Sequence, residues 1–161
     1  MILEGRVHRL GTNVDTDVII PGRYLHLTDI EELKQHIFED LEESLFHRIE
    51  RGDILVCGEN FGCGSSREQA PRVIKACGIA AIIASSFARI FFRNAVNIGL
   101  PVFTCKEVHQ AVQDGDKMKI DTEKGKIFSL TRGAEWAITP YPQFIIDLIE
   151  CGGLIEFAKK L

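Results

Sequence analysis

The sequence predicts an α/β fold in which buried, mostly parallel strands are flanked by helices. Two apolar runs without polar alternation, at residues 54–57 and 79–84, are typical of strands buried on both faces of a parallel sheet. Helical segments are expected after each run, at about residues 66–77 and from residue 85 or 86 onward, which gives a β-α-β-α order. Because the carboxyl ends of parallel strands meet at one edge of a sheet, the loops at residues 58–65 and 85–86 should lie side by side.

Shorter elements are expected on both sides of this central unit. Residues 2–10 alternate loosely and predict a first strand, and the polar region 29–50 is expected to be helical, with Thr28 or Asp29 as its cap. After Gly99, residues 101–103, 118–120 and 127–130 predict a small additional β-layer. A helix at residues 143–150 is expected to end at the Cys-Gly-Gly sequence of residues 151–153, before a short amphipathic end.

Length, charge and cysteine spacing limit the number of domains, the kinds of partner and the kinds of metal site that this chain can have. A chain of 161 residues is expected to form one domain over residues 1–161. Its net charge of -4 argues against nucleic acid or an anionic membrane as a partner. The sequence has no basic leader with an apolar run and no stretch of ~18 apolar residues, so a cytoplasmic protein is expected. Five scattered cysteines without a C-x-x-C pair predict neither a disulfide framework nor a metal site.

The stretch ENFGCGSSREQA, at residues 59–70, is the strongest candidate for a ligand site. Gly62 and Gly64 let a ligand approach the main chain closely, and the unpaired amides at the start of a following helix favour anions. A nucleotide P-loop is excluded because no Lys-Ser/Thr pair follows the last glycine, and a dinucleotide fingerprint is excluded because Arg67 replaces its third glycine. Arg67 can grip a carboxylate through two parallel hydrogen bonds, which indicates a carboxylic acid ligand.

The two serines of this stretch also fit a purely structural role. Ser65 with Glu68, and Ser66 with Gln69, both match the S-x-x-E/Q capping box of a helix N-terminus. One helix needs only one such cap, so we expect Ser66 to cap the helix and to leave the hydroxyl of Ser65 free in the loop. The motif by itself leaves open whether either serine takes part in chemistry.

Further charged residues are candidates for supporting roles. Asp17 lies in an Asp-Thr-Asp turn, where acidic residues are usually solvated turn formers. Arg89 and Arg93 are four residues apart and share one face of a helix. They could hold a substrate or the acidic surface of a partner, but we expect them to brace the loop through ion pairs with Glu59 or Glu68.

Three motifs in this chain closely resemble the small subunit of 3-isopropylmalate dehydratase, an isomerase of the aconitase superfamily. They are ENFGCGSSREQA at residues 59–70, SSFARIFFRN at residues 85–94 and VDTDVIIPGRYL at residues 14–25. The resemblance runs nearly end to end and implies a swivelling β/β/α domain, similar to the C-terminal domain of aconitase but present as a separate chain. The small subunits of homoaconitase and 2,3-dimethylmalate dehydratase share the pattern.

The resemblance implies a hydro-lyase that interconverts 2-isopropylmalate and 3-isopropylmalate in leucine biosynthesis, by removing water and adding it back. It implies that Ser65 is the base, that Gly64, Ser66 and Arg67 contact the substrate, and that Asp17 lies near them. A serine can act as a base only where donors and a nearby cation stabilise its alkoxide. No cluster ligands are visible in this chain, so the [4Fe-4S] cluster is expected in a large subunit, which forms a heterodimer or heterotetramer with it.

The loop at residues 21–28 is the expected determinant of substrate choice. In the resembled family this loop, here Tyr24, Leu25, His26 and Leu27, is apolar where the substrate carries an isopropyl group. The loop has arginine at its third position where homoaconitase binds an extra carboxylate. His26 matches neither pattern, but a mostly neutral histidine is a weaker partner for a carboxylate than arginine, so isopropylmalate is the expected substrate. A non-catalytic carboxylate-binding module is the alternative from a different class.

Overall fold

The computed structural model describes residues 1–161 and is built on one seven-stranded mixed sheet, with the strand order β4-β3-β2-β1-β5-β6-β7. The parallel half consists of β1 (Ile2–Arg9), β2 (Ile54–Cys57), β3 (Ala81–Ala84) and β4 (Val102–Thr104). The antiparallel half consists of β5 (Lys117–Asp121), β6 (Lys126–Ser129) and β7 (Ala134–Ala137). Strand β1 joins the halves, because Val7 pairs with Ile54 of β2 and Ile2 pairs with Asp121 of β5.

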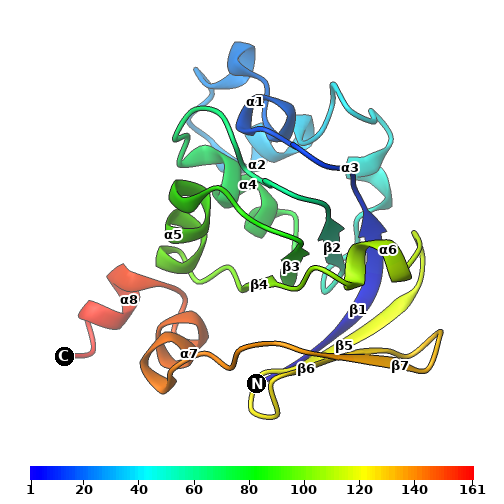
Figure 1. Cartoon of the computed structure of the whole chain (residues 1–161). Coiled ribbons are helices and arrows are strands. Elements are labelled where there is room, and N and C mark those ends of the chain that lie inside the picture. The colour runs from blue at the N-terminus through cyan, green and yellow to red at the C-terminus, as the bar shows by residue number, and fades with distance from the viewer.

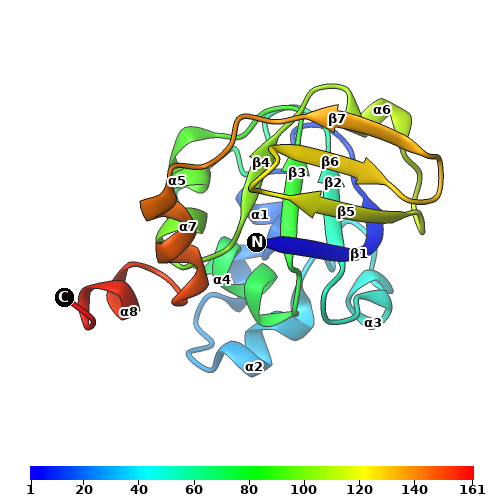
Figure 2. The same ribbon diagram turned by 90° about the horizontal axis from the view of Figure 1, so that it is seen from below.

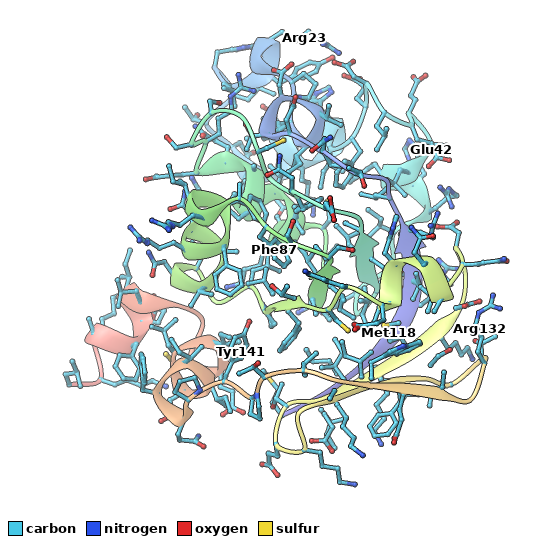
Figure 3. All side chains as sticks on the ribbon, in the orientation of Figure 1. Arg23, Glu42, Phe87, Met118, Arg132 and Tyr141 are labelled. Atoms are coloured by element: carbon cyan, nitrogen blue, oxygen red, sulfur yellow. The ribbon has the colours of Figure 1, made fainter.

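The two halves of the sheet form separate layers in space. Figure 1 shows the antiparallel strands as a curved layer beneath the parallel strands, and in Figure 2 strands β5, β6 and β7 cross β2 and β3 at a steep angle. Met118 of β5 is fully buried in the apolar cluster between the layers, with Ile54 and Ile83 (Figure 3). The antiparallel strands are thus the predicted small β-layer, hydrogen-bonded into the same sheet through β1.

Helices cover the opposite face of the parallel strands. The larger ones are α4 (Gln69–Ala76) and α5 (Arg89–Asn97), and both bury apolar side chains against β2 and β3. One-turn helices join them on this face: α1 (Thr16–Ile19), α2 (Ile30–Leu33) and α3 (Leu45–Arg48), with 3-10 turns at Gly22–Tyr24 and Lys34–His36. Helix α6 (Val108–Ala111) lies on the side of the antiparallel layer, while α7 (Gln143–Glu150) packs against α5 and leads into α8 (Leu154–Ala158).

Most predicted elements are confirmed, and the differences lie in the helices and in the last strand. Strands β1 to β6 and helix α7 lie where the sequence places them, and β2 and β3 are parallel neighbours buried along their whole length. The region 29–50 is not one helical segment but a series of single turns, capped at its start by the side chain of Asp29. Strand β7 and helix α6 were not predicted. None of the helices combines the length and the apolar character needed to span a lipid bilayer.

Candidate active site

Three segments meet at the carboxyl edge of the parallel strands. The loop after β2 and the loop after β3 lie side by side as predicted, because Phe61 N donates to Ser86 O (3.0 Å) and Ala88 N donates to Phe61 O (2.9 Å). The segment after β1 runs along the other side of the first loop. There Gly62 N donates to Val14 O (2.8 Å) and Thr16 N donates to Cys63 O (2.8 Å). The glycine-containing loop is therefore held between two neighbours by main-chain hydrogen bonds.

Glycine is needed at the two positions of this loop, 62 and 64, for different structural reasons. Gly62 has φ of +81°, and a Cβ atom there would come within 2.7 Å of Cδ2 of Phe91 and closer still to its Cβ and Cγ. Gly64 has φ of +93°, but a Cβ atom there would be 3.4 Å from Cβ of Asp15, an ordinary contact. Gly62 thus lets the loop lie directly on α5, while Gly64 sets the backbone direction just before Ser65.

Ser65 and Ser66 lie on the exposed part of this loop. The main-chain amides of Gly64, Ser65 and Ser66 donate to no protein acceptor, so three successive N–H groups are available to an anion. The Ser65 hydroxyl was expected to be free, but its Oγ lies 3.2 Å from Oγ1 of Thr16. The Ser66 side chain is exposed and makes no hydrogen bond within the protein.

The prediction that Ser66 caps the following helix is wrong. Helix α4 begins at Gln69, with Glu68 as its N-cap and no capping hydrogen bond from a side chain. If Ser66 were the cap, its carbonyl would accept from Ala70 N, but Ala70 N donates to Arg67 O instead (3.4 Å). The carbonyl of Ser65 accepts from Arg67 N (2.9 Å) and from Thr16 Oγ1 (2.9 Å), so it does not accept the first helical bond either. Both serines are therefore left outside the helix.

The second helix also begins later than expected. Helix α5 starts at Arg89, with Ala88 as its N-cap, instead of at Ser85 or Ser86. Ser86 serves the neighbouring loop, because its Oγ accepts from Asn60 N (2.8 Å), and Phe87 forms a parallel bridge with Phe61. The extended pairing of the loops takes up the residues that would otherwise form the first helical turn.

Arg67 is fixed by residues from the segment after β1. Its Nη1 donates to Asp17 Oδ1 (2.8 Å) and to Ile20 O (3.1 Å). Asp17 Oδ1 also accepts from Gly22 N (2.9 Å), and these donors, Arg67 first, hold the pKa of Asp17 below its usual 3.8. Nε and Nη2 of Arg67 have no protein partner, so one edge of the guanidinium remains available for a carboxylate. Asp17, which the sequence left without a role, orients this arginine.

The loop proposed to choose the substrate starts beside Arg67. A Cβ atom on Gly22 would be 3.3 Å from Nη2 of Arg67. Tyr24 stacks on His36 with ring centroids 3.7 Å apart. Its neighbour in the chain, Arg23, lies at the uppermost tip of the molecule in Figure 3. Tyr24, Leu25 and Leu27 are only partly exposed, since they pack against the helix-side core, whereas His26 is exposed.

The side chains of this chain do not fit an iron-sulfur cluster. No group of three or more His, Cys, Asp or Glu residues is arranged to hold a metal ion, and all five cysteines are free thiols. Burial raises the pKa of Cys77 to about 12 and that of Cys57 well above its usual value. Thiols of this kind are poor metal ligands, because the ligand is the thiolate.

Comparisons with known proteins agree with this arrangement of motifs. Residues 11–107 match the family of aconitase C-terminal domains. The chain is 51% identical over 159 residues to the 3-isopropylmalate dehydratase small subunit of Caldicellulosiruptor bescii, covering 99% of this chain and 96% of that protein. It is 53% identical over 157 residues to 3-isopropylmalate dehydratase small subunit 1 of Archaeoglobus fulgidus, covering 98% and 97%. The chain belongs to the family of 3-isopropylmalate dehydratase small subunits.

A solved structure of this family has the same fold. The crystal structure of 3-isopropylmalate dehydratase from Methanocaldococcus jannaschii superposes with a TM-score of 0.93 at 44% identity, over 99% of this chain and 95% of that one. The predicted aconitase-like swivelling domain is therefore confirmed. All of the loop residues described above fall inside the aconitase C-terminal match at residues 11–107.

Arg89 and Arg93 do not have the role that the sequence suggested. Neither forms an ion pair with Glu59 or Glu68, or with any other acidic side chain. Both are exposed and line a groove of about 740 Å³ between α5 and the segment that leads into α7. The floor of this groove is apolar and includes Phe92 and Ile145. The arginines therefore border a groove whose floor reaches the buried residues Val96 and Val102, and their charges are not neutralised within the chain.

Two residues of the site were missed by sequence reasoning. Thr16 contacts Ser65, and Gly22 borders the guanidinium of Arg67. Both belong to the motif VDTDVIIPGRYL, which carried the resemblance, but neither was given a role, because a threonine between two acids has the appearance of an ordinary turn residue.

Proposed function

We propose that this chain is the small subunit of a two-chain hydro-lyase that interconverts 2-isopropylmalate and 3-isopropylmalate in leucine biosynthesis. One observation carries the proposal: a serine hydroxyl, three unpaired amides and an arginine edge are presented together on one fixed loop. This set can accept a proton and bind carboxylates, which the removal and return of water from a hydroxy acid requires. Membership in the dehydratase small-subunit family supports the same reaction.

Ser65 is the proposed base. Its alkoxide takes the proton from the carbon next to the departing hydroxyl, and the resulting Ser65 hydroxyl returns the proton when water is added back. The amides of Ser65 and Ser66, which have no protein acceptor, supply donors for negative charge on the loop. Gly64 keeps the main chain free of side-chain atoms next to these amides. The later start of α4 reduces the contribution expected from the helix dipole, so the loop amides and Arg67 carry this role.

Arg67 and Ser66 are the proposed carboxylate contacts. Asp17 and the carbonyl of Ile20 hold Nη1 of Arg67, which leaves Nε and Nη2 to bind a carboxylate through two parallel hydrogen bonds. The exposed Ser66 hydroxyl has no competing protein partner. Arg67 is thus oriented before the substrate arrives, which lowers the entropic cost of binding.

The remaining chemistry is proposed to come from a large subunit. An iron-sulfur cluster in that subunit would act as the Lewis acid for the departing hydroxyl, since this chain offers no fitting ligand set. The active site would then close between two chains, as a heterodimer or heterotetramer in the cytoplasm. Arg89 and Arg93 are proposed docking contacts for an acidic segment of the large subunit, because their charges lie unpaired above an apolar groove floor.

The loop at residues 24–27 is proposed to favour isopropylmalate. Leu25 and Leu27 are partly exposed and can cover an isopropyl group, and burial of three apolar carbons contributes roughly 2 kcal/mol. His26 is the exposed member of the loop, where an arginine would pair with an additional carboxylate. Homoaconitate is therefore the disfavoured substrate, and dimethylmalate remains the closest apolar alternative.

Reconstitution of the two subunits tests this function. The purified chain is mixed with a large subunit of 3-isopropylmalate dehydratase, and the formation of the unsaturated acid from isopropylmalate is followed by absorbance. Activity is expected only in the mixture, and Ser65→Ala is expected to abolish turnover without loss of assembly. The matched control is Ser66→Ala, which should mainly raise KM. A chain that binds isopropylmalate but never supports turnover would instead be a carboxylate-binding module.

Substrate choice is tested in the same mixture. The kcat/KM values for isopropylmalate and homoaconitate are compared, first in the wild type and then in His26→Arg. The wild type should prefer isopropylmalate, and the variant should shift toward homoaconitate. A wild-type preference for homoaconitate would refute the assignment, and an unchanged ratio in the variant would show that this loop does not set the choice.

A further inference from the structure

Thr16 is the only side chain that forms a hydrogen bond with the hydroxyl of Ser65. Its Oγ1 lies 2.9 Å from the carbonyl oxygen of Ser65 and 3.2 Å from Oγ of the same residue. Thr16 is 2% exposed, so the pair is closed to solvent on the threonine side. The main chain of Thr16 is held on both sides, because its N–H donates to Cys63 O (2.8 Å) and its carbonyl accepts from Ile20 N (3.0 Å).

The number of protons in this pair determines how the two hydroxyls are arranged. Each hydroxyl has one proton to donate and can accept two hydrogen bonds. When Ser65 is neutral, Thr16 donates to the Ser65 carbonyl, and its Oγ1 accepts the proton of Ser65. The lone pairs of Ser65 Oγ then face away from Thr16, toward the open side of the loop. When Ser65 has lost its proton, Thr16 is the side chain within reach that can donate to the Ser65 oxygen.

We propose that Thr16 is a positioning residue for Ser65, which moves its hydrogen bond from the Ser65 carbonyl to the Ser65 alkoxide when the base forms. This inference rests on the proposed function, because it assumes that Ser65 is the base. The switch needs a rotation of the Thr16 hydroxyl about its Cβ–Oγ1 bond, since both oxygens of Ser65 are already at hydrogen-bond distance. The two hydroxyl oxygens, 3.2 Å apart, then have to approach by about 0.5 Å to form a hydrogen bond to an alkoxide.

The charged and titratable side chains around this pair have other partners or lie apart from it. Asp15 Oδ1 accepts from Val18 N (2.8 Å) and caps α1. Asp17 and Arg67 are paired with each other. Cys63 touches the segment through its carbonyl, which accepts from Thr16 N. None of these groups donates a proton to Ser65 Oγ, so removal of the Thr16 hydroxyl should act on the ionisation of Ser65 directly.

Three variants of Thr16 in the reconstituted two-subunit enzyme test the proposal. Thr16→Val keeps the shape and removes the hydroxyl, Thr16→Ser keeps the hydroxyl, and Thr16→Ala removes it without adding atoms. Loss of a hydrogen bond to a charged group should lower kcat by about 10- to 100-fold in Thr16→Val and Thr16→Ala, with KM nearly unchanged. The pH at which kcat reaches half of its alkaline plateau should rise by about 1 unit or more in both, since the alkoxide has lost a donor. Thr16→Ser should restore both values.

The outcomes separate this inference from the proposed function. If Ser65→Ala is inactive and Thr16→Val has the wild-type kcat and pH profile, the role of Thr16 is refuted while the function stands. If Thr16→Ser is impaired as much as Thr16→Val, the threonine acts through its methyl group and the proposal is also refuted. If Ser65→Ala keeps normal turnover, the base assignment itself fails. Should Thr16→Val not assemble with its partner, Thr16→Ala provides the same comparison.

Discussion

Replacement of Gly62 by alanine should destabilise this protein more than replacement of a glycine with similar backbone geometry elsewhere. Gly62 and Gly115 have φ of +81° and +89°, but a Cβ atom at Gly62 would overlap Phe91, whereas nothing lies within 4 Å of one at Gly115. The left-handed backbone costs an alanine roughly 1–2 kcal/mol at either site. Overpacking against Phe91, which is 3% exposed, should add about 1–3 kcal/mol at Gly62.

Thermal and urea unfolding of the isolated chain measure this difference. Each kcal/mol corresponds to a fall in Tm of roughly 2–4 °C for a protein of this size. Gly62→Ala should also lower turnover in the reconstituted enzyme, because the loop that carries Ser65 can no longer lie against α5, and Gly115→Ala should not. Equal Tm values for the two variants would refute the reasoning, since they would show that Phe91 moves aside at no cost.

Other parts of the chain lead to three more expectations. Arg67→Lys should lower kcat/KM for isopropylmalate by about 10-fold or more, because an ammonium group cannot hold Asp17 and still present two parallel donors to a carboxylate. Reversal of charge at Arg89 and Arg93, both to Glu, should weaken association with the large subunit by about 10-fold in calorimetry. Asp116→Asn should lower the free energy of unfolding at pH 7. The donation from Arg132 lowers the pKa of Asp116 below its usual 3.8, so its stabilising effect is present above that pH and is lost as the pH falls through the lowered pKa.

Each of these expectations has its own control. The charge reversal is compared with Lys117→Glu combined with Lys124→Glu, which changes the net charge equally at exposed sites without an ion pair. Equal weakening by both double variants would mean that overall charge, and not the groove beside α5, governs association. For Asp116→Asn, the difference from wild type should shrink below about pH 3.8 in chemical denaturation; a difference that is constant with pH would exclude the ion pair as its cause.

The sheet and the meeting of the two loops could be predicted because they depend on strong local patterns. Ile54–Cys57 and Ala81–Ala84 are uninterrupted apolar runs, and the rule that parallel strands end at one edge then brings Phe61 and Ser86 together. Strand β7 was missed because its signal is weak. Trp136 is the only large apolar residue in Ala134–Ala137, and half of the four residues are exposed. Helix α6 has only four residues, too few for a periodic signal.

The errors around the candidate site come from contacts between distant residues. Ser65 was expected to be free because Ser66 was assigned the one cap that the helix needs, yet Thr16 reaches Ser65 from 49 positions away. A distant contact also excludes Ser65 as a cap, since its carbonyl, which a cap would use for the first helical bond, accepts from Thr16 instead. Tertiary contacts thus overrode the local preference of these serines for helix capping. The sequence of residues 59–70 alone contains no sign of the contact with Thr16.

The central position of β1 in the sheet has a consequence for how the protein is made. This strand leaves the ribosome before both of its neighbours in the sheet, so Val7 must wait for Ile54 of β2, and Ile2 must wait for Asp121 of β5. Until then both edges of β1 carry unpaired N–H and C=O groups, which invite pairing with other chains. Closure of such distant pairs is also slow, because the entropy of long loops is lost before the contacts form. The nascent N-terminal strand should therefore be the segment most dependent on chaperones, and a fragment that stops before residue 117 would leave one edge of β1 open.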